Sequence, residues 1–345
     1  VTAGDPQISP DGTTLLFTKS WADPSAAKSK SAIWTADADG NGQRVFTMQA
    51  AAPRWSPDGS QVAFVSDRGD FGNGVFVMPA GGGDATELAR HRGAIGGLAW
   101  SPDGTTLAYA SAFDPDDPDD NGPDKDAAPS VRVVRRYDYK QDNRGYLNDV
   151  RQQIWLAGVD GSGKRKLTGE LVDFDAPQWS PDGKTLAARI SLQNGMGGQL
   201  GLIDAVTGAV TRVGPEAGAV SVWAWSPDGS KIIFGGDTKQ TWQSDLFLYD
   251  VASKTIDQLT TDLPMQPESG FATIALPAQP IWLDDQTVLL AALRGGSSGL
   301  YRFDIETAEL ELAQDFGAVH SGLMLDRATG AVYQAANSLE GTGKI

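Results

Sequence analysis

Three shortages limit what this sequence of 345 residues can do. It contains no cysteine, which excludes disulfides, thiol catalysis and cysteine-bound zinc. Its only histidines, His91 and His320, have no partner at metal-ligand spacing, so we expect no metal and no cofactor, and we place each histidine in a linking segment or at the surface. No apolar run approaches the length of a transmembrane helix.

Basic charge is also scarce. Lysine and arginine total 28 against 44 aspartate and glutamate residues, which gives a net charge of −16. Nucleic acids and anionic membrane surfaces would be repelled, so we expect neither as a partner. A sustained 3.6-residue apolar period is missing, and we therefore expect almost no helix. We also expect a cytoplasmic rather than a secreted or periplasmic protein.

The most frequent motif is Ser-Pro-Asp-Gly, which typically forms a type I turn because proline pre-sets φ and glycine accepts a positive φ. An alternating strand follows each copy, for example Gln61–Val65, so each copy predicts a β-hairpin. The last four of the five copies follow a tryptophan, and the copies begin at Ser9, Ser56, Ser101, Ser180 and Ser226.

The spacing of these serines defines a structural repeat. Successive serines lie 47, 45, 79 and 46 residues apart, and the long interval holds one period plus an insertion. Altered copies follow at Ile281–Leu290 and Leu323–Tyr333, and each repeat carries two further short strands. Four strands every ~45 residues are typical of a propeller blade. We predict an all-β, seven-bladed propeller of four-stranded antiparallel blades over residues 1–345, with the motif tryptophans packed between blades.

The last predicted blade is incomplete. After Tyr333 the sequence has room only to begin a third strand, and an unfinished blade would leave an unpaired edge. We therefore expect the natural polypeptide to continue past Ile345.

The insertion in the third blade spans residues 113–152. Its first half, Asp114–Asp126, holds seven aspartates and one lysine, and we expect a mobile, solvated loop there. Its second half is basic and aromatic, which is a composition enriched at recognition surfaces, although a merely solvated hairpin is an equal alternative. The candidate recognition or interface residues are Arg135, Arg136, Tyr137, Tyr139, Tyr146 and Arg151.

Two local patterns imitate functional motifs. Gly295–Gly299 matches a nucleophile elbow, but a strand rather than a helix follows it, so we predict a turn and assign no catalytic residue. Asp37–Gly42 and Asp117–Gly122 resemble the start of a calcium loop, but Met48 and Ala128 stand where such a loop needs glutamate. We therefore assign no metal ligand in either segment.

The Trp-Ser-Pro-Asp-Gly repeats resemble the propellers of prolyl-oligopeptidase-family serine peptidases and of TolB-like proteins. The segments Arg135–Tyr146, Arg151–Trp155 and Lys166–Thr168 are most similar to the acylaminoacyl peptidase (acyl-peptide hydrolase) branch, although Asn143 stands where that branch has glycine. The resemblance covers the whole chain but only the non-catalytic half of such an enzyme.

This resemblance implies a propeller that gates and selects short or acylated peptides for a C-terminal α/β-hydrolase domain beyond residue 345. No triad residue maps onto this sequence, so we expect this chain alone to be inactive. The implied partners are that hydrolase domain and peptide substrates, and homo-oligomer formation stays open. The alternative is a TolB-like protein-binding module without catalysis.

Overall fold

The computed structural model describes residues 1–25, 28–122, 133–142, 145–191, 197–239, 241, 243–265, 267, 278–295, 297–316, 319–338 and 341–344. All regular elements in these ranges are β-strands, as predicted. Sheet one contains β1 (Thr2–Ile8), β2 (Thr14–Asp23), β3 (Lys28–Asp37) and β4 (Arg44–Met48). Sheet two contains β5 (Ala50–Trp55), β6 (Gln61–Ser66), β7 (Asn73–Pro79) and β8 (Thr86–His91).

The third sheet is interrupted by a small separate hairpin. It contains β9 (Ile95–Trp100), β10 (Thr106–Phe113), β13 (Arg151–Gly158) and β14 (Lys164–Lys166), and the hairpin is β11 (Lys140–Gln141) with β12 (Gly145–Tyr146). Sheet four contains β15 (Phe174–Trp179), β16 (Thr185–Ser191), β17 (Gly198–Asp204) and β18 (Val210–Val213). Sheet five contains β19 (Ala219–Trp225), β20 (Lys231–Asp237), β21 (Asp245–Asp250) and β22 (Ile256–Gln258).

Two sheets complete the described chain. Sheet six contains β23 (Ile281–Trp282), β24 (Thr287–Arg294), β25 (Ser297–Asp304) and β26 (Leu310–Asp315). The last sheet has three strands, β27 (Val319–Leu325), β28 (Val332–Ser338) and β29 (Gly341–Lys344). Every pairing is antiparallel, so the predicted blade architecture is confirmed for six four-stranded sheets.

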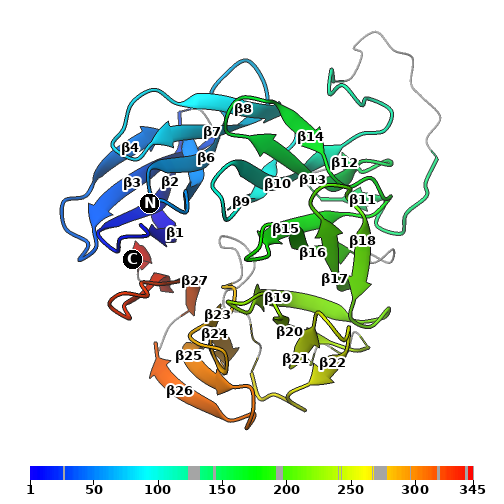
Figure 1. The fold of residues 1–345 in the computed structure, drawn as a ribbon. Coiled ribbons are helices and arrows are strands. Elements are labelled where there is room, and N and C mark those ends of the chain that lie inside the picture. The colour runs from blue at the N-terminus through cyan, green and yellow to red at the C-terminus, as the bar shows by residue number, and fades with distance from the viewer. Residues whose placement is uncertain are drawn as a thin grey trace.

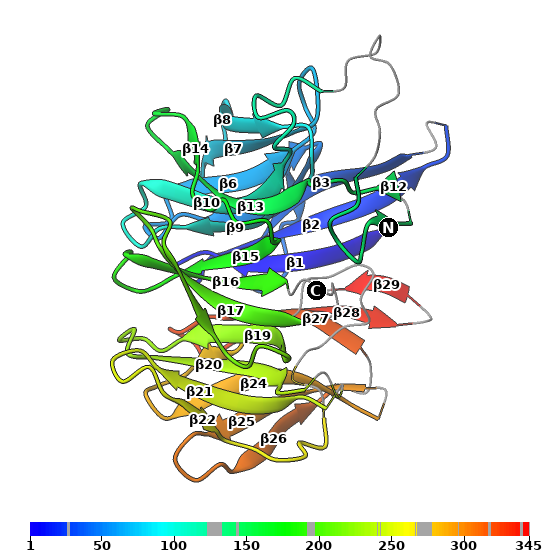
Figure 2. The same cartoon turned by 90° about the vertical axis from the view of Figure 1, so that its right-hand side faces the viewer.

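The sheets stand around a common centre, with the first strand of each sheet innermost and the fourth at the rim (Figure 1). The first strand β1 contacts β27, β28 and β29, which brings the two ends of the described chain side by side (Figure 2). Each pair of neighbouring sheets encloses one hydrophobic cluster, so the core consists of layers between blades.

The Ser-Pro-Asp-Gly copies form the predicted turns between first and second strands. In the second blade the amide of Gly59 donates to the carbonyl of Ser56 at 2.9 Å, and Gly59 has a φ of 72°. The hydroxyl of Ser56 donates to the Asp58 carboxylate at 2.6 Å and accepts from the Gln61 amide at 2.9 Å. Hydrogen bonds lower the pKa of the Asp58 carboxyl to about 2, and the bond from the Ser56 hydroxyl has the largest effect. The turn aspartate is therefore a structural acceptor.

The tryptophan before each turn lies between blades, as predicted, and also joins them. Each indole N–H donates to a main-chain carbonyl of the preceding blade at 2.9–3.4 Å. The bonds are Trp55 to Gln7, Trp100 to Arg54, Trp179 to Ala99, Trp225 to Gln178 and Trp282 to Ala224.

The predicted position of His91 is wrong. His91 ends strand β8 and is 1% exposed, because its ring packs edge-on against Trp155 of the third blade and lies 3.0 Å from the Tyr109 hydroxyl. The backbone of His320 belongs to β27 rather than to a linking segment. The position of His91 could not be predicted from the repeat, because the fourth strands are too short to show alternation.

Candidate functional site

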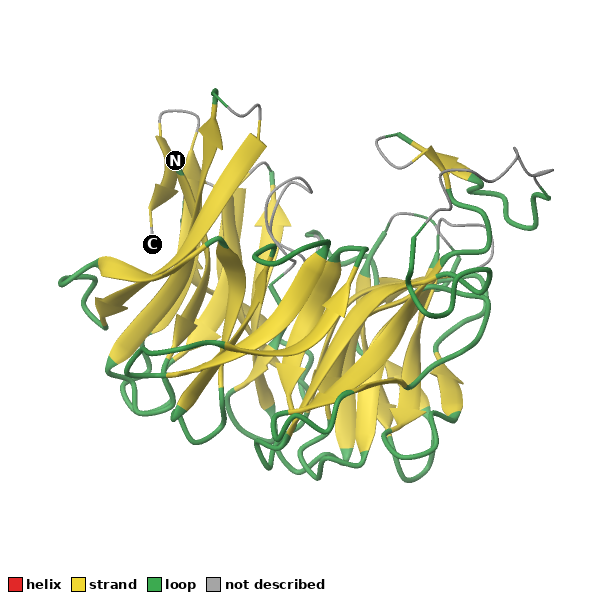
Figure 3. Ribbon diagram, turned by 90° about the horizontal axis from the view of Figure 1, so that it is seen from above, coloured by secondary structure: helices red, strands yellow, loops and turns green. Residues whose placement is uncertain are grey.

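The blade-three insertion lies on one defined face of the ring. It connects the end of β10 to the start of β13, where Phe113 pairs with Arg151. Successive strands run in opposite directions, and the Ser-Pro-Asp-Gly turns join the first strand of a blade to the second. The connection from the second strand to the third therefore lies on the opposite face, which is also the face where β1 begins. Figure 3 shows the β11–β12 hairpin of the insertion rising from that face, on the opposite side of the ring from the N-terminus. We call residues 133–142 and 145–150 the arm.

A cluster of buried charges holds the base of the arm. The side chain of Arg136 is only 5% exposed and forms two hydrogen bonds, of 2.7 and 2.5 Å, to the carboxylate of Asp138. It also donates to Asp173 at 3.1 Å and to the carbonyl of Val150 at 3.0 Å. A planar guanidinium suits this set of acceptors because its donors point in several fixed directions. These bonds to Asp138, Asp173 and Val150 make Arg136 the anchor that holds the base of the arm.

Asp173 receives a second group of contacts from the insertion. The amide of Gln152 donates to its carboxylate at 2.7 Å, and Arg151 lies 3.7 Å from the same carboxylate. Asp173 directly precedes β15, the inner strand of the fourth blade. The cluster thus ties an insertion of the third blade to the start of the inner strand of the fourth blade. The Nε atom of Arg151 is buried and has no hydrogen-bond partner within the described residues.

The charges in this cluster stabilise one another. Hydrogen bonding from Arg136 is the main cause that lowers the pKa of Asp138. Burial alone would lower the pKa of Arg136, but the hydrogen bonds and charges of Asp138 and Asp173 outweigh burial and raise it. Arg136 and Asp138 therefore stay ionised around neutral pH, and this pair supplies no proton donor or acceptor for catalysis.

Four of the predicted residues lie on the solvent-exposed part of the arm. Arg135 is 60% exposed and pairs with Asp149, while Tyr137 is 82% exposed. Tyr139 and Tyr146 are also exposed, and their rings lie 6.2 Å apart across β11 and β12. Exposed aromatic side chains grouped in one segment are typical of an interaction surface.

The six predicted residues therefore divide into two groups. Arg136 and Arg151 meet at Asp173, whereas Arg135 and the three tyrosines lie on the exposed arm. Asp138 and Asp173 were not predicted as partners of these arginines. Asp138 lies within the segment Arg135–Tyr146, but no local pattern links Arg136 to a carboxylate 37 residues later.

The described part of the acidic loop, residues 114–122, is exposed or half-exposed and has a defined conformation. The carboxylate of Asp117 accepts from the amides of Asn121 and Gly122, at 3.0 and 2.6 Å. The main-chain amide of Arg92 donates to the carboxylate of Asp120, and its guanidinium to the Asp120 carbonyl, both at 2.8 Å. Residues 114–122 are thereby fixed to the end of the second blade, and residues 123–126 lie outside the described ranges.

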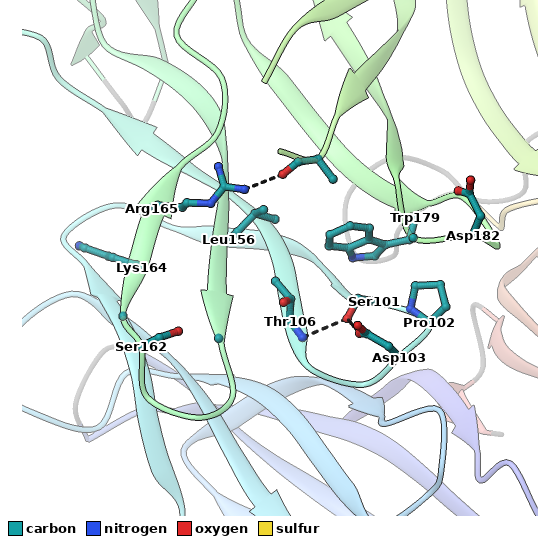
Figure 4. A pocket seen from close by; sticks show the side chains of 14 residues that line it. Ser101, Pro102, Asp103, Thr106, Leu156, Ser162, Lys164, Arg165, Trp179 and Asp182 are labelled. Carbon is teal, nitrogen blue, oxygen red and sulfur yellow. Dashed lines mark hydrogen bonds between the residues drawn. The ribbon is translucent and has the colours of Figure 1, made fainter. Parts of the chain in front are cut away.

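We call the face of the ring that carries the Ser-Pro-Asp-Gly turns the turn face. A groove of about 420 Å³ lies on this face between the third and fourth blades (Figure 4). Its polar groups are occupied by structural bonds. Ser101 donates to Asp103 at 2.5 Å and accepts from the Thr106 amide at 3.0 Å, while Arg165 donates to the Ala205 carbonyl at 2.5 Å. Figure 4 shows these bonds lining the groove, which is a seam between blades and offers no nucleophile–base pair.

Neither catalytic nor metal chemistry is evident where the chain is described. Strand β24 ends at Arg294, and β25 begins at Ser297, which pairs with Arg294. The segment Gly295–Gly299 therefore belongs to a hairpin between two strands. Within the described ranges, no three histidine, cysteine or acidic side chains gather as metal ligands. The same ranges hold no helix that could span a membrane.

The fold and the insertion define a β-propeller with one elaborated face. No family model matches the sequence. The chain is 31% identical over 196 residues to an uncharacterized peptidase of Bacillus subtilis, covering 56% of this chain and 30% of the relative. It is 26% identical over 267 residues to dipeptidyl-peptidase 5 of Porphyromonas endodontalis, covering 69% of this chain and 37% of the relative.

The propeller is similar in structure to that of Pyrococcus horikoshii acylaminoacyl peptidase. The TM-score is 0.64 at 16% identity, over 94% of this chain and 47% of that one. The resemblance expected from the repeats and the insertion is confirmed at the level of the propeller. This chain spans 30–37% of the length of the two curated relatives and 47% of the solved enzyme.

Proposed function

We propose that this chain is the peptide-selecting propeller domain of a serine peptidase similar to acylaminoacyl peptidase. Curated relatives that are peptidases and a propeller likeness over 94% of the chain support the proposal. The observation that carries it is the anchored arm, whose base is held by Arg136 and Asp173 while its tyrosines remain exposed. A fixed, exposed surface can limit which peptides pass.

In this proposal residues 1–345 form a seven-bladed propeller in which β27–β29 belong to the seventh blade. The contacts of β1 with these strands support ring closure. An α/β-hydrolase domain follows in the polypeptide and covers the face that carries the arm. The parent enzyme hydrolyses acylated or short peptides through an acyl-serine intermediate, and this chain supplies no catalytic residue.

The six candidate residues then have different tasks. Arg136 and Arg151 position the arm by binding Asp173 at the start of the inner strand of the fourth blade. Arg135, Tyr137, Tyr139 and Tyr146 face the substrate chamber or the hydrolase domain. Tyrosine suits both tasks because it offers a large, stiff, amphipathic surface.

The location of the chemistry can be tested with an acetyl-aminoacyl chromogenic substrate. We expect the full-length protein to hydrolyse it and the 345-residue chain to show no turnover. Comparable turnover by the isolated chain would refute the proposal. Absence of activity in a full-length protein without a hydrolase domain would instead favour the TolB-like binding module.

Gating can be tested in the full-length protein with acetylated peptides of increasing length. We expect Tyr137→Ala to raise kcat/KM for long peptides relative to the small chromogenic substrate, because it removes bulk from the chamber side. Val206→Ala on the opposite face is the matched control, since Val206 is equally exposed at 80%. A gating role would be contradicted if length selectivity is unchanged both in Tyr137→Ala and in the variant that replaces Tyr137, Tyr139 and Tyr146 by alanine.

A further inference from the structure

A second groove lies on the turn face, near the mouth of the central channel and opposite the arm. Its volume is about 350 Å³, and it runs across the inner ends of the fourth, fifth and sixth blades. Its walls include Trp179, Trp225 and Trp282 together with three prolines. A volume of this size fits one or two amino-acid residues, at the small end of the usual range for ligand sites.

The indole groups of this groove are fixed and present apolar walls. The indole N–H of Trp179 donates to Ala99 at 3.2 Å, and that of Trp225 to Gln178 at 3.4 Å. Trp282 is bonded in the same way across the next seam, at 3.1 Å. Trp282 is only 2% exposed, so a ligand meets the half-buried rings of Trp179 and Trp225 and the exposed prolines Pro181 and Pro227 rather than free indole donors. Such a surface favours apolar side chains and proline-containing backbone.

Arg327 is the one charged residue among the described residues that line this groove. Its guanidinium donates to the Trp282 carbonyl at 2.9 Å, which directs it along the groove wall, and the residue is exposed. A guanidinium has five N–H donors, so one such bond leaves donors for a ligand. In a chain of net charge −16, an exposed arginine beside an apolar groove provides local complementarity to a carboxylate.

We propose that this groove binds the C-terminal end of a peptide, with the terminal carboxylate on Arg327 and the last apolar side chain against the indoles of Trp179 and Trp225. A neutral sugar would leave Arg327 unused, and a nucleic acid would be repelled by the acidic surface. The site is distinct from the arm, which lies on the other face, and it does not depend on a hydrolase domain.

The test uses the 345-residue chain and two peptides that differ in one group. Acetyl-Ala-Pro-Leu with a free carboxylate is compared with its C-terminal amide, by calorimetry at low salt and by tryptophan fluorescence. We expect the free acid to bind at least tenfold more tightly, because a charge-assisted pair replaces a neutral contact. Equal binding of acid and amide overturns the proposal.

Variants assign the effect to the groove. Arg327→Gln can still donate to the Trp282 carbonyl but lacks the charge, so we expect it to fold and to lose the preference for the acid. Arg327→Lys should keep part of that preference. Arg44→Met, at an exposed arginine of β4, is the matched control and should bind as the wild type does. A preference that survives in Arg327→Gln, or that is lost in Arg135→Met on the arm, overturns the assignment.

Discussion

The buried His91 should make the stability of this propeller depend on pH above the range where carboxylates titrate. Its ring is 1% exposed between the second and third blades, and burial, together with the charge of Lys164, lowers its pKa to about 3. The unfolded chain binds a proton on this histidine near pH 6.5, so the unfolded state gains protons first as the pH falls. Stability is therefore full above about pH 6.5 and decreases toward pH 3.

The size of the effect follows from these two pKa values. Between about pH 7.5 and about pH 5 the linkage relation gives a loss of about 2 kcal/mol in the free energy of unfolding. His91→Gln should remove this loss, because the amide can replace the imidazole opposite the Tyr109 hydroxyl, 3.0 Å away, without titrating. The measurement is urea unfolding at several pH values, followed in parallel by tryptophan fluorescence and circular dichroism.

The control is His320→Gln, which removes the other histidine of the chain. With two histidines, their ring proton resonances can also be titrated directly by NMR, and that of His91 should not titrate down to about pH 4.5. A parallel loss of stability in the wild type and in His91→Gln between about pH 7.5 and about pH 5 would refute the reasoning.

Three further predictions concern the joints of the ring. Trp100→Phe leaves the Arg54 carbonyl, now bonded at 2.9 Å, without its indole partner and should lower the unfolding free energy by about 1–2 kcal/mol in urea titrations. Gly97→Ala should cost about 1–3 kcal/mol, since its new Cβ would lie 2.7 Å from Pro177, and unchanged urea stability would argue against this close contact. Arg136→Met should destabilise the chain by about 3 kcal/mol because it uncovers two carboxylates, whereas the exposed Arg135→Met should change stability by less than about 1 kcal/mol. Equal effects of the two arginine variants would contradict the anchor.

The repeat could be predicted because each part of it is local. Proline and glycine define the turn by their backbone preferences, and the tryptophan at each turn marks an inner strand. The inner strands also contain a bulge that no local pattern revealed. Asp5, Ala52, Gly97, Ala176 and Gly322 occupy equivalent places with φ between 48° and 69°. Alanine and aspartate are poor indicators of a positive φ, so here the surrounding sheet overrides local preference.

The candidate site was predicted only in part, because its bonds connect distant segments. Composition identified the basic, aromatic half of the insertion, and the exposed tyrosines agree with that interpretation. The division into buried anchors and exposed surface required knowing that Arg136 reaches Asp173, in the next blade. The fixed conformation of residues 114–122 likewise depends on Arg92, which belongs to the preceding blade.

Departures from the repeat mark both proposed sites. Five seams carry an indole–carbonyl bond, but Ile8 and Leu325 occupy the tryptophan position in the first and last sheets. At the seam next to Leu325, Arg327 instead donates to the Trp282 carbonyl at 2.9 Å. The substitution of an arginine for an indole contact introduces a charge into an apolar groove, just as the insertion introduces arginines at the opposite face. A regular ring needs neither change for its stability, which is why we assign ligand recognition to these two places rather than to the repeated turns.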